Sequence, residues 1–335
     1  MPRSLVEFFR EEYLKGFIRA GGSKIKLYTS ESRERRAALL QELAREAVAC
    51  GYAAALVDGA TVARVHLFSN LYQAVTAELD IAGFIQRYTG QVVKALGYDP
   101  GEVTPGMTFV DWAAEVHERI PERLRREVQE RLERDLFRNK SIYRGFATVA
   151  VQLAADVLGA TERKLTPQDR ELLYSWLRGE SVLLRDLKRF HVFTRVDRYN
   201  ARLFLRSLVE LARLAGYHGL FVAVDNLDVL LARRETGRPL YSRTARDEFY
   251  ESVRQLIDEI DTLHHLIIIL GFNRDLAEHP TFGIKSYIAL WLRIQCEIEG
   301  KRVNLFRDFL DLDRLPAEPG TLSPMPSGGS QVAGV

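Results

Sequence analysis

The sequence has few cysteines and no long apolar run. Its 335 residues include two cysteines, Cys50 and Cys296, in apolar helical surroundings without metal-ligand spacing. Two such cysteines favour reduced core side chains in a cytoplasmic protein over a disulfide framework or a zinc site. No apolar run approaches the roughly 20 residues that a membrane-spanning helix requires. The stretch from Met1 to Phe17 carries acidic residues and no continuous apolar segment, so we do not expect a signal peptide.

Net charge is also nearly absent. The chain has 47 lysines and arginines against 45 acidic residues, which leaves a formal charge of +2. Overall charge therefore does not indicate nucleic-acid binding, and only local clusters of basic residues can do so. The hydrophobic content of 47% supports a real core. A chain of this length accommodates one large α/β domain with an insertion, or two domains.

The chain is organised around an apolar run from Phe221 to Val224, which follows Gly219 and ends at Asp225. A short valine-rich run of this kind predicts a buried parallel strand, and ligands bind at the carboxyl ends of such strands. Asp225 fits the Walker B aspartate that holds Mg²⁺ in P-loop NTPases, although an ordinary N-cap aspartate gives the same pattern. The next residue, Asn226, cannot take a proton from water as a glutamate can.

Four apolar runs are expected to form one mainly parallel sheet. They are Ile25 to Tyr28, Ala54 to Val57, Phe221 to Val224 and Leu266 to Leu270. Helical spacing between the first two runs completes a βαβ unit. The last run is expected beside the Walker B-like strand. Asn273, which follows it, stands where AAA+ ATPases keep a sensor-1 residue, but asparagine is also a common turn residue at such a place.

The turn between the first strand and its helix is the expected place of a phosphate-binding loop, and it contains no glycine. A working loop needs glycines for close backbone approach, a lysine for the phosphates and a Ser or Thr for Mg²⁺. The sequence SESRERRAALL, which begins at Ser30, places Arg36 near the lysine position and Ala37 at the hydroxyl position. Glu31 and Glu34 in the same loop would repel phosphate.

The chain between the two halves of the sheet is helical by pattern. We expect a first part of the α/β core over residues 1–66, a helical insertion over 67–194, a second part of the core over 195–315 and a disordered tail over 316–335. The helices expected in the insertion are 67–96, 109–138, 141–158, 167–178 and 181–190. The helices expected around the sheet are 4–18, 33–50, 196–215, 244–263 and 284–299.

Two local clusters of basic residues flank the central strand. The first comprises Arg185, Lys188, Arg189, His191, Arg195, Arg198, Arg202 and Arg206. The second comprises Arg233, Arg234, Arg238, Arg243 and Arg246. Both patterns suit either a solvated surface or contact with nucleic acid or an acidic partner. Arg293 and Arg246 are also candidates for an arginine finger, which one chain supplies to the nucleotide of its neighbour.

Several stretches together resemble one protein family. The runs NARLFLRSLVELARLAGYHGLFVAVDNLDVLL, FYESVRQLIDEID and SYIALWLRI, with GGSKIKLY near the N-terminus, are similar to the BrxC/BrxD-like ATP-binding proteins of BREX-type bacterial defence systems. The resemblance covers roughly residues 15–80 and 195–315. It implies an α/β fold of the P-loop NTPase and AAA+ type with a large helical insertion, binding of ATP and Mg²⁺, and association with phage resistance and DNA.

The chain departs from the family pattern at the catalytic positions. The resemblance implies glycines at Ser30, Arg33 and Arg35, lysine at Arg36, Ser or Thr at Ala37 and glutamate at Asn226, whereas Asp225 is retained. We therefore expect a non-catalytic, cytoplasmic pseudo-ATPase without a cofactor or metal. It would bind a homologous ATPase, another defence protein or DNA, and it would be able to form oligomers. Asp225, Asn226 and Asn273 mark the degenerate catalytic positions, and Arg36, Ala37 and Asp225 mark the degenerate site for ATP and Mg²⁺.

Two alternatives stay open at this point. An active ATP-binding protein with an unorthodox loop would need Lys24 or Arg36 to replace the lysine, and arginine is not its geometric equivalent. Lys24 ends a Gly-Gly-Ser-Lys run that precedes a strand instead of opening a helix, which is the wrong context for phosphate binding. A free-standing DNA-binding regulator would show an affinity that falls steeply with salt and does not depend on nucleotide.

Overall fold

A computed structural model describes residues 4–161, 164–295 and 304–315. In this part of the chain five strands form one sheet in the order β2-β3-β4-β1-β5, and every neighbouring pair is parallel. The strands are β1 (Ser23–Thr29), β2 (Ala53–Asp58), β3 (Leu220–Asp225), β4 (Leu266–Phe272) and β5 (Phe309–Asp311). The predicted parallel α/β fold is confirmed, and β3 pairs directly with β4 as expected. The strand β5 was not predicted, because its three residues are too few to show an alternating pattern.

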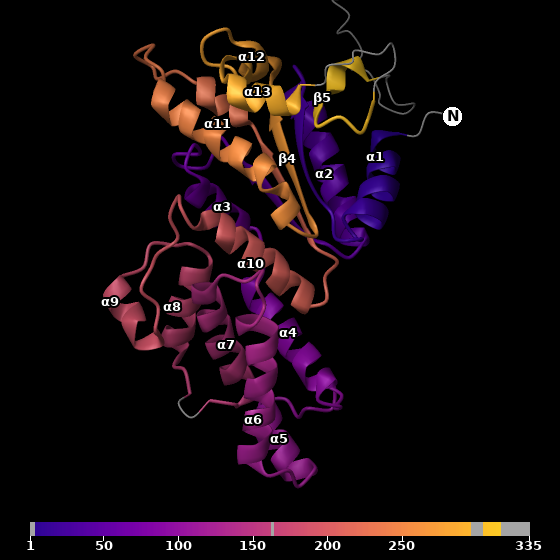
Figure 1. Cartoon of the computed structure of the whole chain (residues 1–335), viewed down its shortest axis with the longest axis vertical. Helices are drawn as coiled ribbons and strands as arrows, with labels where there is room; N and C mark the ends of the chain where they lie inside the picture. Colours follow the sequence, from indigo (N-terminus) through magenta and orange to yellow (C-terminus); the bar gives the residue numbers. More distant parts are fainter. Residues whose placement is uncertain (1–3, 162–163, 296–303, 316–335) are drawn as a thin grey trace, which may run out of the picture.

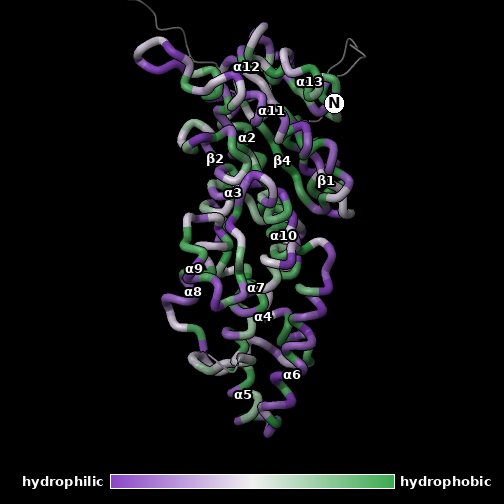
Figure 2. The backbone as a smooth tube through the Cα atoms, turned by 60° about the vertical axis from the view of Figure 1, so that its left-hand side comes forward, coloured by the Kyte–Doolittle hydropathy of each residue, from purple (hydrophilic) through white to green (hydrophobic). Residues whose placement is uncertain are grey.

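The sheet is covered by helices on both faces. Alternate side chains of a strand point to opposite sides, so each strand contributes to the packing on both faces. Phe221 and Ala223 of β3 pack with the N-terminal helices and α2 (Arg33–Ala49), whereas Val222 and Val224 pack with the helices of the other face. Both β3 and β4 are buried along their whole length, which explains their continuous apolar sequence. In Figure 2 the tube of β4 is green where it passes through the sheet.

The first face is covered by the N-terminal segment and α2. The N-terminal segment comprises α1 (Leu5–Phe8) and the π-helix η1 (Phe9–Phe17), close to the predicted helix 4–18. The second face is covered by α3 (Phe68–Ala77), α10 (Ala201–Leu214) and α11 (Arg243–Asp258). Short helices complete this part of the fold: η4 (Leu227–Leu231), η5 (Ile260–Thr262), α12 (Arg274–Glu278), η6 (Ile284–Ser286), α13 (Ile288–Ile294) and η7 (Leu312–Arg314).

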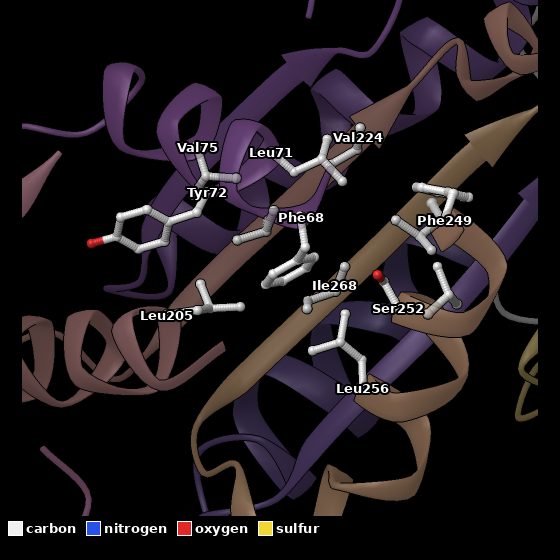
Figure 3. Close-up of a pocket in the computed structure, with 13 residues that line it drawn as sticks. Phe68, Leu71, Tyr72, Val75, Leu205, Val224, Phe249, Ser252, Leu256 and Ile268 are labelled. Atoms are coloured by element: carbon white, nitrogen blue, oxygen red, sulfur yellow. The ribbon is translucent and has the colours of Figure 1, made fainter. Parts of the chain in front are cut away.

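The second face is closed by apolar packing. A cavity of about 30 Å³ lies between β3, β4, α3 and α11, and Phe68, Leu71, Ile268 and Phe249 line it (Figure 3). A cavity of this size holds at most about one water molecule, and apolar cavities stay dry. This space is therefore a gap in the core and offers no room for a nucleotide.

The insertion forms a helical body below the sheet, and Figure 1 shows it extending the molecule along its long axis. Its elements are α3, α4 (Ile81–Ala95), α5 (Phe109–Val116), α6 (Pro121–Leu132), η2 (Glu133–Phe137), α7 (Arg144–Leu158), α8 (Pro167–Leu177), α9 (Leu184–Leu187) and η3 (Lys188–Phe190). α10 packs on α3, α4 and α7 and so joins the two bodies.

Several predicted helices are shorter than expected. The helix 67–96 is interrupted because the Asp80 carboxylate caps α4 by accepting from the Gly83 amide at 2.8 Å. The helix 109–138 is interrupted because Glu118 has a positive φ of 50° and Pro121 starts a new helix. The prediction for 181–190 was wrong over its first residues, since α9 begins at Leu184.

The helices that flank β3 and β4 are also shorter than predicted. α10 begins at Ala201 because the Asp197 carboxylate accepts from the amides of Tyr199 and Asn200 and holds a turn. α11 ends at Asp258, before a 3-10 turn. α13 covers only 288–294 of the predicted 284–299. Residues 296–299, with Cys296, and the tail 316–335 lie outside the described residues, and Cys50 is half-buried instead of lying in the core.

Candidate degenerate nucleotide site

The carboxyl ends of β2, β3 and β4 bring together the polar residues that the sequence singled out. Asp58 ends β2, Asp225 ends β3, and Asn273 directly follows β4. α2 also starts at this edge of the sheet. Ser32 caps the helix by accepting from the Arg35 amide at 3.1 Å. The parallel topology therefore places the predicted Walker B-like and sensor-1-like positions at one edge of the sheet.

Arg36 fills this site with its guanidinium group. Its side chain comes from the first turn of α2 and is only 2% exposed. Nε donates a hydrogen bond to Asp225 Oδ1, and Nη2 donates to Asn226 Oδ1 at 3.1 Å. Nη1 donates to the Ser30 carbonyl at 3.1 Å, and Nη2 lies 3.5 Å from Asp228 Oδ1. The cation that the Asp225 carboxylate meets is thus an arginine of its own chain.

This arrangement does not fit Mg²⁺ as the partner of Asp225. The ion requires carboxylate or hydroxyl oxygens at about 2.1 Å with octahedral geometry, but the guanidinium already engages Asp225. Ala37, at the position of the hydroxyl ligand, is half-buried and has no oxygen in its side chain. Within the described residues no cluster of three or more His, Cys, Asp or Glu could hold a metal ion.

Asn226 is a bridge between two strand ends. Its backbone has a left-handed conformation with φ 56°, which asparagine tolerates better than most residues. Its Oδ1 accepts from Arg36, and its Nδ2 donates to Asp58 Oδ1 at 2.9 Å. A glutamate cannot donate in this way. The Asn226 side chain, at the position where we expected a degenerate Walker B glutamate, therefore links Arg36 to the end of β2.

Gly271 in β4 makes room for the buried ion pair, and the sequence analysis missed it. A Cβ atom at this position would lie 2.4 Å from Asp225 Oδ1 and 3.3 Å from Arg36 Cδ. Any larger side chain would therefore displace the carboxylate or the guanidinium. A glycine inside a long apolar strand was the signal, because such glycines mark close approach of another group.

A carboxylate from the C-terminal segment occupies the loop that precedes α2. Asp313 Oδ2 accepts from the Glu31 amide at 2.8 Å, and Asp313 Oδ1 accepts from the Ser30 hydroxyl at 2.7 Å. The guanidinium groups of Arg274 and Arg35 lie 3.5 Å and 3.7 Å from the same carboxylate. In a phosphate-binding loop, backbone N–H groups at this place hold phosphate oxygens. Here one such group, the Glu31 amide, holds Asp313 together with the Ser30 hydroxyl.

The surroundings of Asp313 favour its charged form. Partial burial alone would raise the pKa of this carboxyl, but the hydrogen bonds from the Glu31 amide and the Ser30 hydroxyl, together with Arg274 and Arg35, hold the pKa below its ordinary value. No sequence pattern indicated this contact, because the two partners are separated by 282 residues.

A sequence model of the BREX system ATP-binding protein BrxC/D family matches residues 18–319. The chain belongs to this family. Membership makes the protein a component of a phage-defence system with partners in that system. No curated protein and no solved structure matches the chain. In the described part of this family member, no helix is long and apolar enough to cross a membrane.

The sensor-1-like residue of this BrxC/D family member caps a helix. Asn273 Oδ1 accepts from the Leu276 backbone amide at 3.1 Å, and the backbone amide of Asn273 donates to Asp228 Oδ1 at 3.1 Å. The side chain thus starts α12, which is the turn role that the sequence left open. It lies at the same sheet edge as Asp225 without an interaction between the two side chains in the described structure.

The two lysines of β1 do not join the site. Lys24 lies at the start of β1, the end opposite to the loop, where its Nζ lies 2.5 Å from Asp308. Lys26 is buried, and its Nζ donates to the carbonyls of Leu305 at 3.1 Å and Arg307 at 2.7 Å. Burial lowers the pKa of Lys26 to about 8. Neither amine reaches the phosphate-loop position, so of the two candidate replacements for the lysine, Lys24 and Arg36, Arg36 is the one found there.

The first basic cluster is largely tied into internal contacts. Arg206 donates to the Ser141 carbonyl at 3.0 Å, and Arg202 lies 3.2 Å from Glu259. Other members with an acidic partner within 4 Å are Arg185, Arg189 and Arg198. Lys188, His191 and Arg195 are exposed. These contacts neutralise much of the positive charge of the first basic cluster.

The second cluster divides into exposed and buried residues. Arg233, Arg234 and Arg238 lie on an exposed hairpin, whereas Arg246 is 97% buried and does not project from the surface as an arginine finger must. Arg293, the other candidate for an arginine finger, donates to Asp258 at 3.0 Å and is about one-third exposed. Arg293 therefore stays accessible, and Arg246 needs a different role.

Proposed function

We propose that this BrxC/D family member is a non-catalytic subunit that acts by contact with an ATPase partner, with DNA or with both. The observation that carries the proposal is the guanidinium of Arg36 on Asp225, in the place where an ATPase needs Mg²⁺. The proposal includes a cytoplasmic location, a capacity to form oligomers, and the division into two core parts and a helical insertion.

The free energy needed to disrupt the ion pair between Arg36 and Asp225 supports this function. Mg²⁺ at Asp225 would be repelled by the guanidinium that holds Oδ1, and disrupting such a buried ion pair costs about 3–5 kcal/mol. A ligand with micromolar affinity gains about 8 kcal/mol on binding. The loss of this one pair would therefore offset about half of the binding free energy of such a nucleotide, before Asp313 is displaced.

One observation favours a second candidate, an ATP-binding protein with a non-standard loop. The loop before α2 still holds an anionic group with the Glu31 amide and the Ser30 hydroxyl, close to Arg274 and Arg35. In this reading a phosphate replaces the Asp313 carboxylate, and Arg36 stays on Asp225. Such a site would bind phosphate without the metal position.

Calorimetry with Mg·ATP distinguishes these functions. We expect no binding heat at ATP concentrations up to the millimolar range and no phosphate release above the buffer background. Micromolar affinity that is lost in Asp225→Ala would overturn the non-catalytic proposal. Micromolar affinity that survives Asp225→Ala but is lost in Arg274→Ala would instead support the second candidate. Arg274→Ala removes a cation beside the loop and leaves the pair of Arg36 and Asp225 intact.

The contact role is tested with the partner. We expect this subunit to co-purify with a homologous ATPase of the same defence system, and Arg293→Ser to reduce the ATP hydrolysis of that partner if Arg293 reaches its nucleotide. An arginine finger contributes at least about 10³-fold to hydrolysis where it is used. Absence of any complex with the partner ATPase, at low salt and micromolar protein, would contradict the subunit role.

A further inference from the structure

The segment after η4 is an ordered hairpin that presents arginines in fixed positions. Arg233 pairs with Pro239 as an antiparallel bridge, and the Arg234 amide donates to the Arg238 carbonyl at 2.8 Å. The Leu240 amide donates to the Ala232 carbonyl at 2.8 Å. In Figure 1 this connection between β3 and α11 projects at the upper left of the molecule.

A cleft lies between this hairpin and the start of α11. It has a volume of about 510 Å³ and is open to solvent on one side. Its lining includes four arginines and two aromatic residues: Arg234, Arg238, Arg243, Arg246, Tyr241 and Phe282. No acidic side chain lines it among the described residues. The cleft therefore concentrates positive charge that the hairpin and the helix hold in place.

Arg246 forms the buried part of this lining. Its Nη1 donates to the Leu230 carbonyl at 3.2 Å, and its guanidinium lies 4.0 Å from the centre of the Phe282 ring. Its Nε is buried and has no hydrogen-bond partner in the described structure. No carboxylate of the described residues lies within ion-pair distance. A buried donor on a charged group is costly when it stays unpaired, so the site favours an anion.

The start of α11 adds to the same preference. The 16-residue helix carries two arginines and no acidic residue in its first turn, and Ser242 is its cap. A helix N-terminus has partial positive charge, so cations there are unfavourable without a counter-charge. The nearest acid to Arg243 is Asp247, at 3.8 Å. Burial also lowers the pKa of Arg246, which shows that its surroundings disfavour the charge.

We propose that this cleft binds a phosphate group of a nucleic-acid strand, with Arg246 at its base and Arg234, Arg238 and Arg243 around it. Guanidinium groups that converge from the hairpin and from α11 suit the tetrahedral oxygens of phosphate better than the two coplanar oxygens of a carboxylate. The cleft is open to solvent, which lets the strand continue past the site.

The inference rests on the proposed function only in taking the protein to act by contact. It does not depend on the state of the Arg36 site, which nucleotide calorimetry tests separately. A chain that binds ATP could still bind DNA through the cleft, and a chain that fails to bind ATP could still lack nucleic-acid binding. The two failures are therefore distinguishable.

The test is fluorescence anisotropy of the full chain with labelled single-stranded and duplex oligonucleotides from 50 to 200 mM KCl. We expect the double variant Arg234→Ser/Arg238→Ser to bind at least about tenfold more weakly. Its slope of log affinity against log salt should fall by roughly one unit, because the two arginines share one phosphate contact and each lost phosphate contact removes about 0.9. Arg246→Met, checked for an unchanged helical spectrum, should lose binding similarly.

Two single variants are matched controls. Arg233→Ser removes the same charge from the same hairpin outside the cleft lining, and Arg123→Ser removes an exposed arginine from α6. Both should bind within about threefold of the wild type, since neither removes a direct phosphate contact. An Arg233→Ser variant as weak as the double variant would mean that the charge of the hairpin acts and the cleft does not.

Four further outcomes overturn the proposal. One is that the double variant binds oligonucleotides with the same affinity and the same salt dependence as the wild type. Another is no oligonucleotide binding even at 50 mM KCl. The third is binding of inorganic phosphate or ATP that depends on Arg234 and Arg238 while oligonucleotides do not bind, since the ligand is then a free phosphate compound. Polyglutamate that competes as well as an unlabelled oligonucleotide would assign the cleft to an acidic protein instead.

Discussion

Arg36 holds three parts of the molecule together. Its guanidinium joins the first turn of α2 to the end of β3 through Asp225 and to the preceding loop through the Ser30 carbonyl. A buried pair of this kind is a weak source of net stability, but each partner depends on the other. The residue that replaces a nucleotide-binding lysine has thus become part of the core.

Replacing Arg36 by Ala should destabilise the protein by about 3–5 kcal/mol, because it leaves Asp225 buried without a counter-charge. Unfolding in urea followed by circular dichroism measures the difference. In Arg36→Ala/Asp225→Ala the loss should be smaller than the sum of the two single losses. Arg33→Ala, which removes an exposed arginine 3.4 Å from Asp58, should change stability little. Equal losses in the Arg36 and Arg33 variants would contradict the buried pair.

The sequence predicted the positions of these residues better than their interactions. Arg36, Asn226 and Asp225 were expected at one site from the strand and helix patterns, and the parallel sheet places them there. The direct bond from Arg36 to Asp225 was not predicted, since it depends on the missing Cβ of Gly271. A pattern along the chain gives no measure of such space across the sheet.

The loop before α2 and the segment that begins with β5 stabilise each other. β5 pairs with β1, and the Asp313 carboxylate that follows it accepts from the Glu31 amide. This edge of the sheet depends on a three-residue strand, so the polar contacts at its end carry much of its order. The sequence offered no signal for β5, because FLD fits either strand or loop.

Asp313→Asn should loosen this edge. Above about pH 4 the wild type gains stability from the charged carboxylate, because its folded pKa lies below the unfolded value. That gain is lost as the pH falls through the folded pKa, so the two proteins should approach equal stability in acid. Hydrogen exchange of the Glu31 amide should be faster in the variant at pH 7. A difference in stability that grows toward pH 3 would contradict this assignment, and Arg314→Ala, which changes an exposed side chain, is the control.

The sheet and the helical insertion share one core. Phe204 of α10 is fully buried and lies 4.9 Å from Trp176, 5.4 Å from Tyr143 and 5.8 Å from Tyr72, measured between ring centres. The same helix packs toward β3 through Leu205, beside the small apolar cavity. The sequence assigned α10 to the second part of the core, whereas its packing joins both bodies. Segment order along a chain does not determine which bodies a helix connects.

Phe204→Ala should therefore destabilise the whole molecule, by about 3–5 kcal/mol. Urea unfolding measured by tryptophan fluorescence and by circular dichroism should shift together, as one cooperative transition. Leu203→Ala, on the partly exposed side of the same helix, is the matched control and should have a smaller effect. Two separate transitions, with only the first shifted, would show that the insertion unfolds independently.

The Asp313 carboxylate has a consequence for how the protein responds to metabolism. An ATP-binding loop is filled in proportion to the nucleotide concentration around it, so its order rises and falls with the energy supply of the cell. The anion in this loop is covalently part of the chain, and its local concentration is constant. Under the proposed function, in which ATP does not displace Asp313, starvation or the depletion of ATP during an infection leaves the position filled. The subunit proposed above would give a defence complex a component whose conformation does not depend on the ATP concentration in the cell.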